Sequence, residues 1–370
     1  MERALARSRD RFEGARPRSK PIRLMIVDDS TVARAVLSRM IEADPAFEIV
    51  AVAGTAEHAI EALDQVRVDV VLLDLEMPGA GGLEALPKVI AAAAGAKVMI
   101  VSSLAEEGAE QTVAALAKGA ADTLPKPGKG NFYGRFSEVL IGKLKALGHA
   151  AAPILEPAPQ RSLSAQPPLR AMPSDPIDIL AIGASTGGIH SLGAFFHSLP
   201  KKIGVPILVT QHLPGPFMPV FARQLGVVAH RECLVAQDGM QIRADRIYVA
   251  PGDAHLTLEP AGKSIVIRLT HGRTASGCMP SVDPMFASIG AVYGSGAVGV
   301  ILTGMGRDGV EGAARMVACG GSVIAQDEAS SAVWGMPKAV LDAGLACAVL
   351  PPDKIARRVA SRTEEQPGCK

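Results

Sequence analysis

Three residues in the second half of the chain have the types and surroundings of a serine hydrolase site. Ser185 lies in Gly-Ala-Ser-Thr-Gly, residues 183–187, directly after an apolar run. This segment fits the G-x-S-x-G pattern, in which glycines permit a sharp strand-to-helix turn that exposes the serine. His212 follows the next apolar run and could act as the base, and Asp308 could orient its imidazole. Together these residues predict nucleophilic attack on an acyl group, with no metal or cofactor at this site.

The same segments could supply donors for the negative charge that such an attack creates. A serine at the start of a helix lies beside free backbone N–H groups and the positive end of the helix dipole. Met305 lies in the glycine-rich run 303–309, which also contains Asp308. Glycines there leave backbone N–H groups available, so the N–H of Met305 is a candidate oxyanion donor.

Each of these residues could also have a role other than catalysis. The glycine-rich loop could cradle the pyrophosphate of a dinucleotide. However, the next strand ends in Thr210-Gln211-His212 and offers no acid to hold a ribose. His212 alone could be structural, and Asp308 could cap a helix that begins near Val310. A single triad accounts for all three residues and is the preferred interpretation.

A second set of candidate residues lies at strand ends in the first third of the chain. Asp28 and Asp29 follow the first predicted strand, Asp74 ends the third, Ser102 the fourth, and Lys126 follows the fifth. Because the carboxyl ends of parallel strands meet at one edge, these side chains should converge. Clustered carboxylates favour Mg²⁺, and the set suits phosphoryl transfer to an aspartate. Singly, the acids could instead cap a helix or form a turn.

Two parallel sheets are needed to bring these residues together. Short β-rich runs alternate with amphipathic stretches from residue 22 to about 147 and again from 178, which predicts two doubly wound α/β domains. The expected strands are residues 23–27, 48–53, 68–74, 97–102 and 122–124, then 178–182, 205–210, 246–249, 297–302 and 322–325, with a hairpin at 255–258 and 264–269.

Composition divides the chain into five segments. A length of 370 residues allows two domains. The predicted segments are a basic flexible leader (1–20), a first domain (21–147), a proline-rich linker (148–176), a second domain (177–360) and a tail (361–370). The leader has seven Arg or Lys residues and no apolar run, so it does not resemble a secretory signal.

Several classes of function are disfavoured by the composition. A formal net charge of +1 suggests neither nucleic acid nor an acidic membrane as a partner. The five cysteines are odd in number and lack metal-binding spacing, which argues against disulfides and for a reducing, cytoplasmic location. The uncharged stretch 287–306 contains repeated glycines, which favours two buried elements over a span inserted in the membrane.

The acidic set lies within motifs that resemble those of response-regulator receiver domains. The motifs are VDDS (27–30), DLEMPG (74–79), VSS (101–103) and LPKP (124–127). The resemblance implies a flavodoxin-like fold with Asp74 as the phospho-acceptor. It also implies that Mg²⁺ is bound by Asp28, Asp29, Asp74 and the backbone carbonyl of Glu76. Ser102 would be the switch hydroxyl, and Lys126 would contact the phosphate. Gly81 departs from the pattern, since receivers often carry Asp there.

The second half resembles the catalytic domain of chemotaxis protein-glutamate methylesterases, the CheB family. The motifs are GASTGG (183–188), QHLP (211–214), APGD (250–253), PSVDPMF (280–286) and TGMGRDG (303–309). The resemblance implies the triad Ser185, His212 and Asp308, with Thr186 and Met305 around the oxyanion. Met279 departs from the family, which commonly has Arg there.

Together the two resemblances imply a phosphorylation-activated enzyme of chemotaxis adaptation. Its substrates would be methyl-accepting chemoreceptors, from which it releases methanol and some of whose glutamines it deamidates. A histidine kinase of the same system would be the phosphodonor. Without phosphate, the first domain would pack over the Ser185 edge and block receptor helices. The alternatives are a receiver with a non-catalytic binding module and a general carboxylesterase, for which the chain has no visible lid and little aromatic lining.

Overall fold

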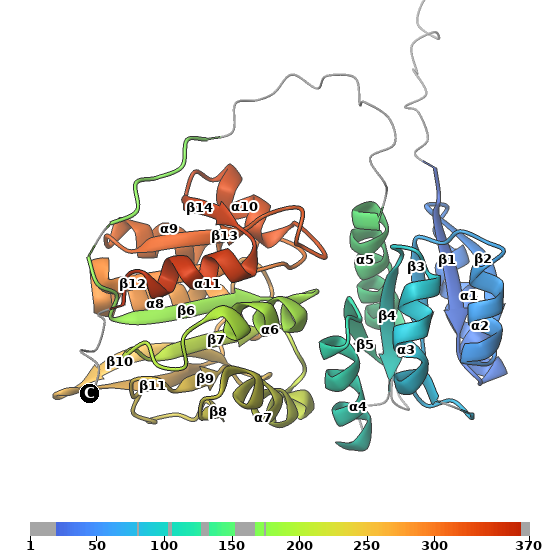
Figure 1. Cartoon of the computed structure of the whole chain (residues 1–370), viewed down its shortest axis with the longest axis horizontal. Helices are drawn as coiled ribbons and strands as arrows, with labels where there is room; N and C mark the ends of the chain where they lie inside the picture. The colour runs from blue at the N-terminus through green and yellow to red at the C-terminus, as the bar shows by residue number, and fades with distance from the viewer. Residues whose placement is uncertain are drawn as a thin grey trace, which may run out of the picture.

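Two α/β domains lie side by side, each with helices on both faces of a central sheet (Figure 1). The computed structural model describes residues 20–79, 81–102, 106–126, 133–151, 167–173 and 175–363. Nearly all of the predicted leader, and much of the predicted linker and tail, lie outside these residues. The predicted α/β class is confirmed.

Continuous apolar runs build the sheet of the first domain. Its elements are β1 (Ile22–Val27), α1 (Thr31–Glu42), β2 (Phe47–Ala53), α2 (Ala56–Leu63), β3 (Val70–Leu73), α3 (Gly81–Ala92), β4 (Lys97–Ser102), α4 (Glu106–Ala117), β5 (Asp122–Pro125) and α5 (Tyr133–Ala151). The strands are parallel in the order β2-β1-β3-β4-β5. β1 and β3 are almost fully buried, as expected for parallel strands covered on both faces.

Two separate apolar clusters flank this sheet. Leu37 of α1 and Leu140 of α5 pack on one face. Ala59 of α2, Val89 of α3 and Val113 of α4 pack on the other. The helices therefore cover the faces and leave the carboxyl edge of the sheet for the acidic residues.

The second domain is built on a larger parallel sheet. Its strands are β6 (Ile179–Ala184), β7 (Ile207–Gln211), β8 (Cys233–Val235), β9 (Ile247–Val249), β12 (Ala297–Ile301), β13 (Ser322–Gln326) and β14 (Ala346–Leu350), with the antiparallel hairpin β10 (His255–Ala261) and β11 (Ser264–Thr270) beside it. Its helices are α6 (Gly188–Ser198), α7 (Met218–Ala229), α8 (Val282–Tyr293), α9 (Val310–Ala318), α10 (Met336–Asp342) and α11 (Pro352–Ala360).

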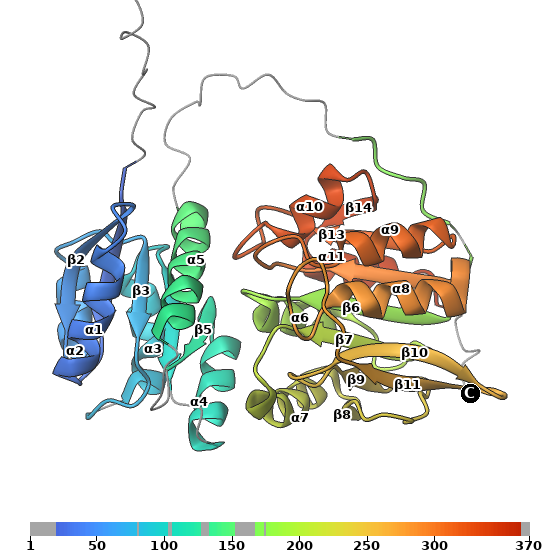
Figure 2. The ribbon, with the colours of Figure 1, turned by 180° about the vertical axis from the view of Figure 1, so that it is seen from behind.

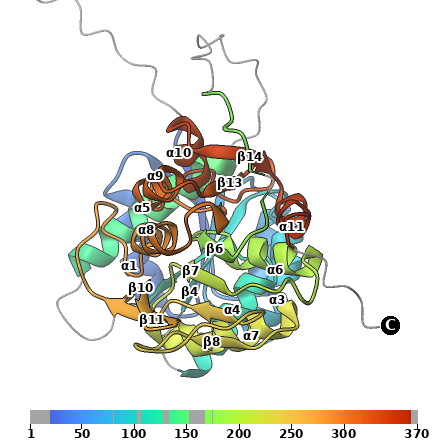
Figure 3. The same ribbon diagram turned by 90° about the vertical axis from the view of Figure 1, so that its left-hand side faces the viewer.

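The strand order reverses in the middle of this sheet. The order is β14-β13-β12-β6-β7-β9-β8, so β6 lies between β7 and β12. Figure 3 shows α8, α9 and α10 on one face of the sheet and α6, α7 and α11 on the other. In open parallel sheets, ligands bind outside the carboxyl ends of the strands at such a switch point. Ser185 follows the carboxyl end of β6 directly.

Most predicted strands are found within two residues of their predicted ends, and the predicted hairpin is confirmed. Two strands, β8 and β14, were not predicted. Both lie at sheet edges and are largely half-buried, so they lack the continuous apolar pattern of the central strands. Helix α5 runs to Ala151, four residues beyond the predicted end of the first domain at 147. The exact domain boundaries remain predictions.

Candidate active site

Ser185 lies in the sharp turn between β6 and α6. Its N–H donates to the carbonyl of Thr303 at 3.0 Å, and its own carbonyl accepts from the N–H of Gly188 at 2.8 Å. Gly187 has φ +76°, and a Cβ there would lie 2.4 Å from the Cβ of Ala332. Only glycine fits this position, because both the left-handed backbone and the close packing exclude a side chain. The predicted strand-turn-helix geometry is present.

His212 reaches Ser185 because β6 and β7 are neighbouring parallel strands. Gly183 pairs with Thr210 and Ala184 with Gln211, so the two strands end at the same level. His212 Nδ1 lies 3.1 Å from Ser185 Oγ, and its Nε2 lies 2.8 Å from Asp308 Oδ2. The three side chains therefore form one hydrogen-bonded chain across the switch point.

Asp308 is held by donors on both of its oxygens. Oδ1 accepts from Ser281 Oγ at 2.6 Å, and Oδ2 accepts from the N–H of Val282 at 2.7 Å as well as facing His212. It does not cap the following helix: the N-cap of α9 is Gly309, with no side-chain cap. The carboxylate is thus fixed in orientation and directed at the imidazole.

Electrostatics favour an ionised carboxylate beside a positively charged imidazole. Burial opposes charge on Asp308, but the hydrogen bonds and positive charge of His212, with the bonds from Ser281 and Val282, hold its pKa well below the usual range. Burial likewise acts to lower the pKa of His212. Hydrogen bonds with Asp308 and Cys278 outweigh it and raise this pKa to about 9. Such a pair stabilises the imidazolium that forms when histidine takes a proton.

The segment after β12 approaches Ser185 closely. A Cβ on Gly304 would lie 2.7 Å from the Cβ of Ser185, so glycine is required there. Among the described residues, the N–H groups of Thr186 and Met305 donate to no protein acceptor, while the N–H of Gly304 donates to Val333 at 3.0 Å. The two predicted oxyanion positions thus have N–H groups available.

Some contacts of this site were not predicted from the sequence. Gln211 Nε2 donates to the carbonyl of Ser185 at 2.9 Å and anchors the turn. Ser281 holds Asp308, although in the sequence it stands out only as part of the PSVDPMF motif. Cys278 lies beside His212 and Asp308. A lone cysteine and a strand-end glutamine carry no local signal of such contacts.

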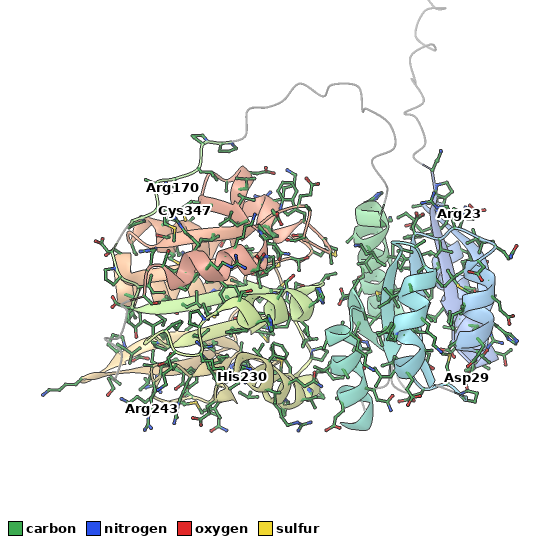
Figure 4. The ribbon with its side chains drawn as sticks, in the orientation of Figure 1. Arg23, Asp29, Arg170, His230, Arg243 and Cys347 are labelled. Carbon is green, nitrogen blue, oxygen red and sulfur yellow. The ribbon has the colours of Figure 1, made fainter. Side chains whose placement is uncertain are left out.

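The acidic residues of the first domain also converge. Asp28, Asp29 and Asp74 have carboxylate oxygens within 4.8 Å of one another. Lys126 Nζ lies 2.6 Å from Asp74 Oδ2 and 3.1 Å from Asp28 Oδ2. Ser30, not either aspartate, caps α1. Asp29 follows the carboxyl end of β1, and Arg23 lies near its start, as Figure 4 shows.

This pocket fits a hard divalent cation. Its ligand atoms are three carboxylates, the oxygen donors that Mg²⁺ prefers, and the ammonium of Lys126 lies beside them to offset their charge in the described pocket. Burial raises the pKa of Asp74, partly offset by Lys126. The N–H of Glu76 donates to Asp74 Oδ1 at 3.2 Å, which places the Glu76 peptide at the pocket. The side chain of Ser102 lies outside the described residues, and its role stays a prediction.

The first domain packs on the edge of the second domain that carries Ser185. Figure 2 shows α4, β5 and α5 turned towards the second domain. Thr186 Oγ1 donates to Asp122 Oδ2 at 2.5 Å, and the N–H of Gly187 donates to the carbonyl of Ala121 at 2.7 Å. Both domains line a cavity of only about 10 Å³ beside Ser185, roughly the space of one water.

Comparison with known proteins agrees with this arrangement. The response regulator receiver domain family matches residues 24–132, and the CheB methylesterase family matches residues 180–359. A Paramagnetospirillum magneticum protein named protein-glutamate methylesterase/protein-glutamine glutaminase 1 is 40% identical, with 92% of this chain and 96% of the relative covered. The chain belongs to the CheB methylesterase family. A Caulobacter vibrioides relative with the same name, numbered 2, is 44% identical and covered over 99% of its length.

CheB membership confirms the predicted combination of a receiver with a methylesterase domain. The predicted enzyme class is also confirmed, because the CheB relatives are named as methylesterases and glutaminases. Met279 directly follows Cys278 and is 44% exposed. Within the part of this CheB chain that the structure describes, no helix is long and apolar enough to cross a membrane.

Proposed function

We propose that this chain is a receiver-controlled protein-glutamate methylesterase in which Ser185 is the nucleophile, His212 the base and Asp308 the group that orients His212. The observation that carries the proposal is the continuous hydrogen-bonded chain from Ser185 Oγ through both nitrogens of His212 to Asp308. The substrates are γ-glutamyl methyl esters of methyl-accepting chemoreceptors. The proposal is tested by measuring methanol release from methylated receptor membranes.

The first half of the reaction forms an ester between Ser185 and the glutamyl group. His212 Nδ1 accepts the hydroxyl proton as Ser185 Oγ attacks the ester carbonyl. The N–H groups of Thr186 and Met305 stabilise the oxyanion. When the tetrahedral intermediate collapses, the proton on Nδ1 passes to the departing methoxide, and methanol leaves. Asp308 stabilises the imidazolium throughout.

The second half releases the product. A water molecule takes the place of methanol, gives a proton to Nδ1 and attacks the acyl carbonyl. Collapse of this second intermediate returns the proton to Ser185 Oγ and frees the glutamate side chain. A glutamine side chain follows the same path with ammonia as the leaving group, which corresponds to the glutaminase activity in the names of the relatives.

The receiver controls access to Ser185. The contacts of Asp122 with Thr186 and of Ala121 with Gly187 hold the receiver against the turn that carries Ser185, where it would obstruct a receptor helix. β5 links the two functional regions of the receiver, because Asp122 is its first residue and Lys126 follows its end. A phosphoryl group on Asp74 draws Lys126 away from the carboxylates, and this movement reaches Asp122 through the short strand. Asp28, Asp29, Asp74 and the Glu76 carbonyl would hold Mg²⁺, which would supply charge neutralisation for phosphoryl transfer.

Partners follow from the same proposal. A chemotaxis histidine kinase supplies the phosphoryl group, chemoreceptors are the substrates, and the enzyme works in the cytoplasm. Ser102 and Lys126 complete the phosphoryl site, Ser102 as the switch hydroxyl and Lys126 as the phosphate contact.

Removing the Asp122 carboxylate is expected to release the closed state. Asp122 accepts from Thr186 and pairs with Lys143 at 2.6 Å, in a largely buried part of the interface. A hydrogen bond to a charged group contributes about 1.5–3 kcal/mol, so Asp122→Ala should raise the methanol-release rate of the unphosphorylated chain by about tenfold. The control is Glu110→Gln, which removes the exposed ion pair with Arg223 in the same interface. It should change the rate less than about threefold. Equal rates for Asp122→Ala and wild type would show that the contact between Asp122 and Thr186 does not hold the closed state.

Activity should rise with pH up to the pKa of His212. The groups that face His212 are Ser185, Asp308 and Cys278, with Asp283 behind Asp308. Because its pKa is about 9 and the base must be neutral, kcat/KM for ester hydrolysis should increase about tenfold per pH unit below that value. The charged form also stabilises the fold, fully below the unfolded pKa of 6.5 and progressively less as pH rises through about 9. A methanol-release rate that does not change with pH below about 9 would contradict the role of neutral His212 as the base.

Asp74→Asn is expected to abolish activation by a small acyl phosphodonor. An amide cannot accept the phosphoryl group, so the rates with and without the donor should be equal in this variant. The wild-type rate should rise by about tenfold with the donor. This corresponds to a change of about 1.4 kcal/mol in the free-energy difference between the closed and open states. Asp64→Asn, on the exposed end of α2, serves as the control and should retain activation. Activation of Asp74→Asn by the donor would place the phosphorylated residue elsewhere.

A further inference from the structure

Cys278 brings a thiol to the catalytic residues. Its Sγ, a ring nitrogen of His212 and a carboxylate oxygen of Asp308 all lie within 4.8 Å of one another. Cys278 lies in the loop before α8, His212 at the end of β7 and Asp308 in the loop after β12. We propose that these side chains form a Zn²⁺ site whose occupation reversibly switches the hydrolase off.

The donor set matches zinc and differs from that of the receiver pocket. Thiolate, imidazole and carboxylate are the three protein ligands that zinc prefers. In a tetrahedral site with bonds of about 2.0–2.3 Å, ligand atoms lie roughly 3.3–3.8 Å apart. Separations under 4.8 Å can close around an ion through small side-chain movements. The receiver pocket offers only oxygen from Asp28, Asp29 and Asp74, which favours Mg²⁺.

The surroundings already orient one of the ligands. Ser281 Oγ and the N–H of Val282 donate to Asp308. Such outer hydrogen bonds fix ligating carboxylates in metal sites. Cys278 and His212 are half-buried and keep contact with solvent, so an ion can reach them. Three protein ligands leave the fourth position for water.

Metal binding stops the proton transfer that the triad needs. An ion between His212 and Asp308 takes Nε2, because this nitrogen is directed at the carboxylate. A neutral imidazole bound through Nε2 carries its proton on Nδ1. Nδ1 lies 3.1 Å from Ser185 Oγ, so it would then donate to that oxygen and could not accept its proton. The inhibition rests on the proposed function, whereas the metal binding does not.

Binding is tested with Co²⁺ as a spectroscopic substitute for zinc, on the full chain in excess Mg²⁺. A thiolate ligand gives a sulfur-to-cobalt charge-transfer absorption, which the oxygen-only receiver pocket cannot give. We expect this band in the wild type and its loss in Cys278→Ser. Cys347→Ser should keep it, because this half-buried thiol lies on the edge strand β14 (Figure 4). The absence of a band in the wild type, or its survival in Cys278→Ser, overturns the proposal.

Inhibition is tested by titrating Zn²⁺ against methanol release, with each variant compared with its own metal-free rate. At ten times the apparent Kd, about one tenth of the wild-type rate should remain. Loss of outer-shell partners alone weakens metal sites by about 10–100-fold. Loss of the Cys278 ligand should therefore raise the inhibitory zinc concentration at least about tenfold.

The outcomes separate the two proposals. Inhibition of Cys278→Ser at wild-type zinc concentrations, or cobalt binding without inhibition by zinc, overturns the zinc switch. A chain that releases no methanol even without metal refutes the proposed function, and the cobalt spectra then still decide whether the metal site exists.

Discussion

Ser185→Ala is expected to reduce methanol release by roughly four to six orders of magnitude, as removal of a nucleophile does in other serine hydrolases. His212 Nδ1 contacts the hydroxyl of Ser185 at 3.1 Å. Alanine removes this oxygen and leaves the turn intact, because the fold contacts of residue 185 are made by its backbone with Thr303, Gly188 and Gln211. The folded state should therefore be retained.

The measurement is methanol release together with the thermal unfolding midpoint. Ser264→Ala is the matched control, because this half-buried serine lies on the hairpin and its hydroxyl accepts from Gln241. The rate of this variant should stay within about twofold of the wild type. A Ser185→Ala chain that unfolds normally and still demethylates receptors would show that another group attacks the ester.

Asp308→Asn should reduce the rate of methanol release by about four orders of magnitude. Replacing the aspartate of a triad by asparagine has such an effect because the amide stabilises the wrong tautomer of the histidine. The carboxylate accepts from Ser281, Val282 and His212 in its present geometry. If the asparagine carbonyl takes the place of Oδ1 and keeps the hydroxyl donor of Ser281, its NH₂ group takes the place of Oδ2. There it faces Nε2 and donates to it, and the bond from the N–H of Val282 is lost. The proton then resides on Nδ1, which donates to Ser185 and cannot act as the base.

Two measurements distinguish this mechanism from simple loss of structure. The unfolding midpoint of Asp308→Asn should fall only modestly, because an amide occupies the same space. Its pH–rate profile should also lose the rise towards about 9 that the charged pair produces. Asp342→Asn, whose side chain is exposed on α10, is the control for removing a carboxylate. Wild-type activity in Asp308→Asn would remove Asp308 from the mechanism.

Local sequence predicts the strand ends of this protein well because burial imposes a simple pattern. Strands β6 and β12 are covered on both faces and read as uninterrupted apolar runs, so their ends could be located closely. The turn at Ser185 could be predicted as well, since Gly187 and Gly183 allow backbone and packing that other residues do not. Edge strands β8 and β14 are only half-buried and could not be found in this way.

The convergence of Ser185, His212 and Asp308 could be predicted because parallel strands place their carboxyl ends at one edge. The observed order confirms this reasoning, with β6 between the strands that precede the other two residues. The same rule brought together Asp28, Asp29 and Asp74. In both domains, residue type near the strand ends was sufficient to predict that these particular side chains meet.

By itself the sequence determined two parallel α/β domains and the side chains at the open edge of each sheet, because apolar runs and glycine turns are local signals. Only the tertiary structure decided which groups surround those side chains. Cys278 and Ser281 reach the triad from a loop whose path depends on how α8 packs. Asp122 reaches Thr186 from the other domain. Such contacts depend on how whole elements and domains pack together, and no local pattern around either residue encodes that.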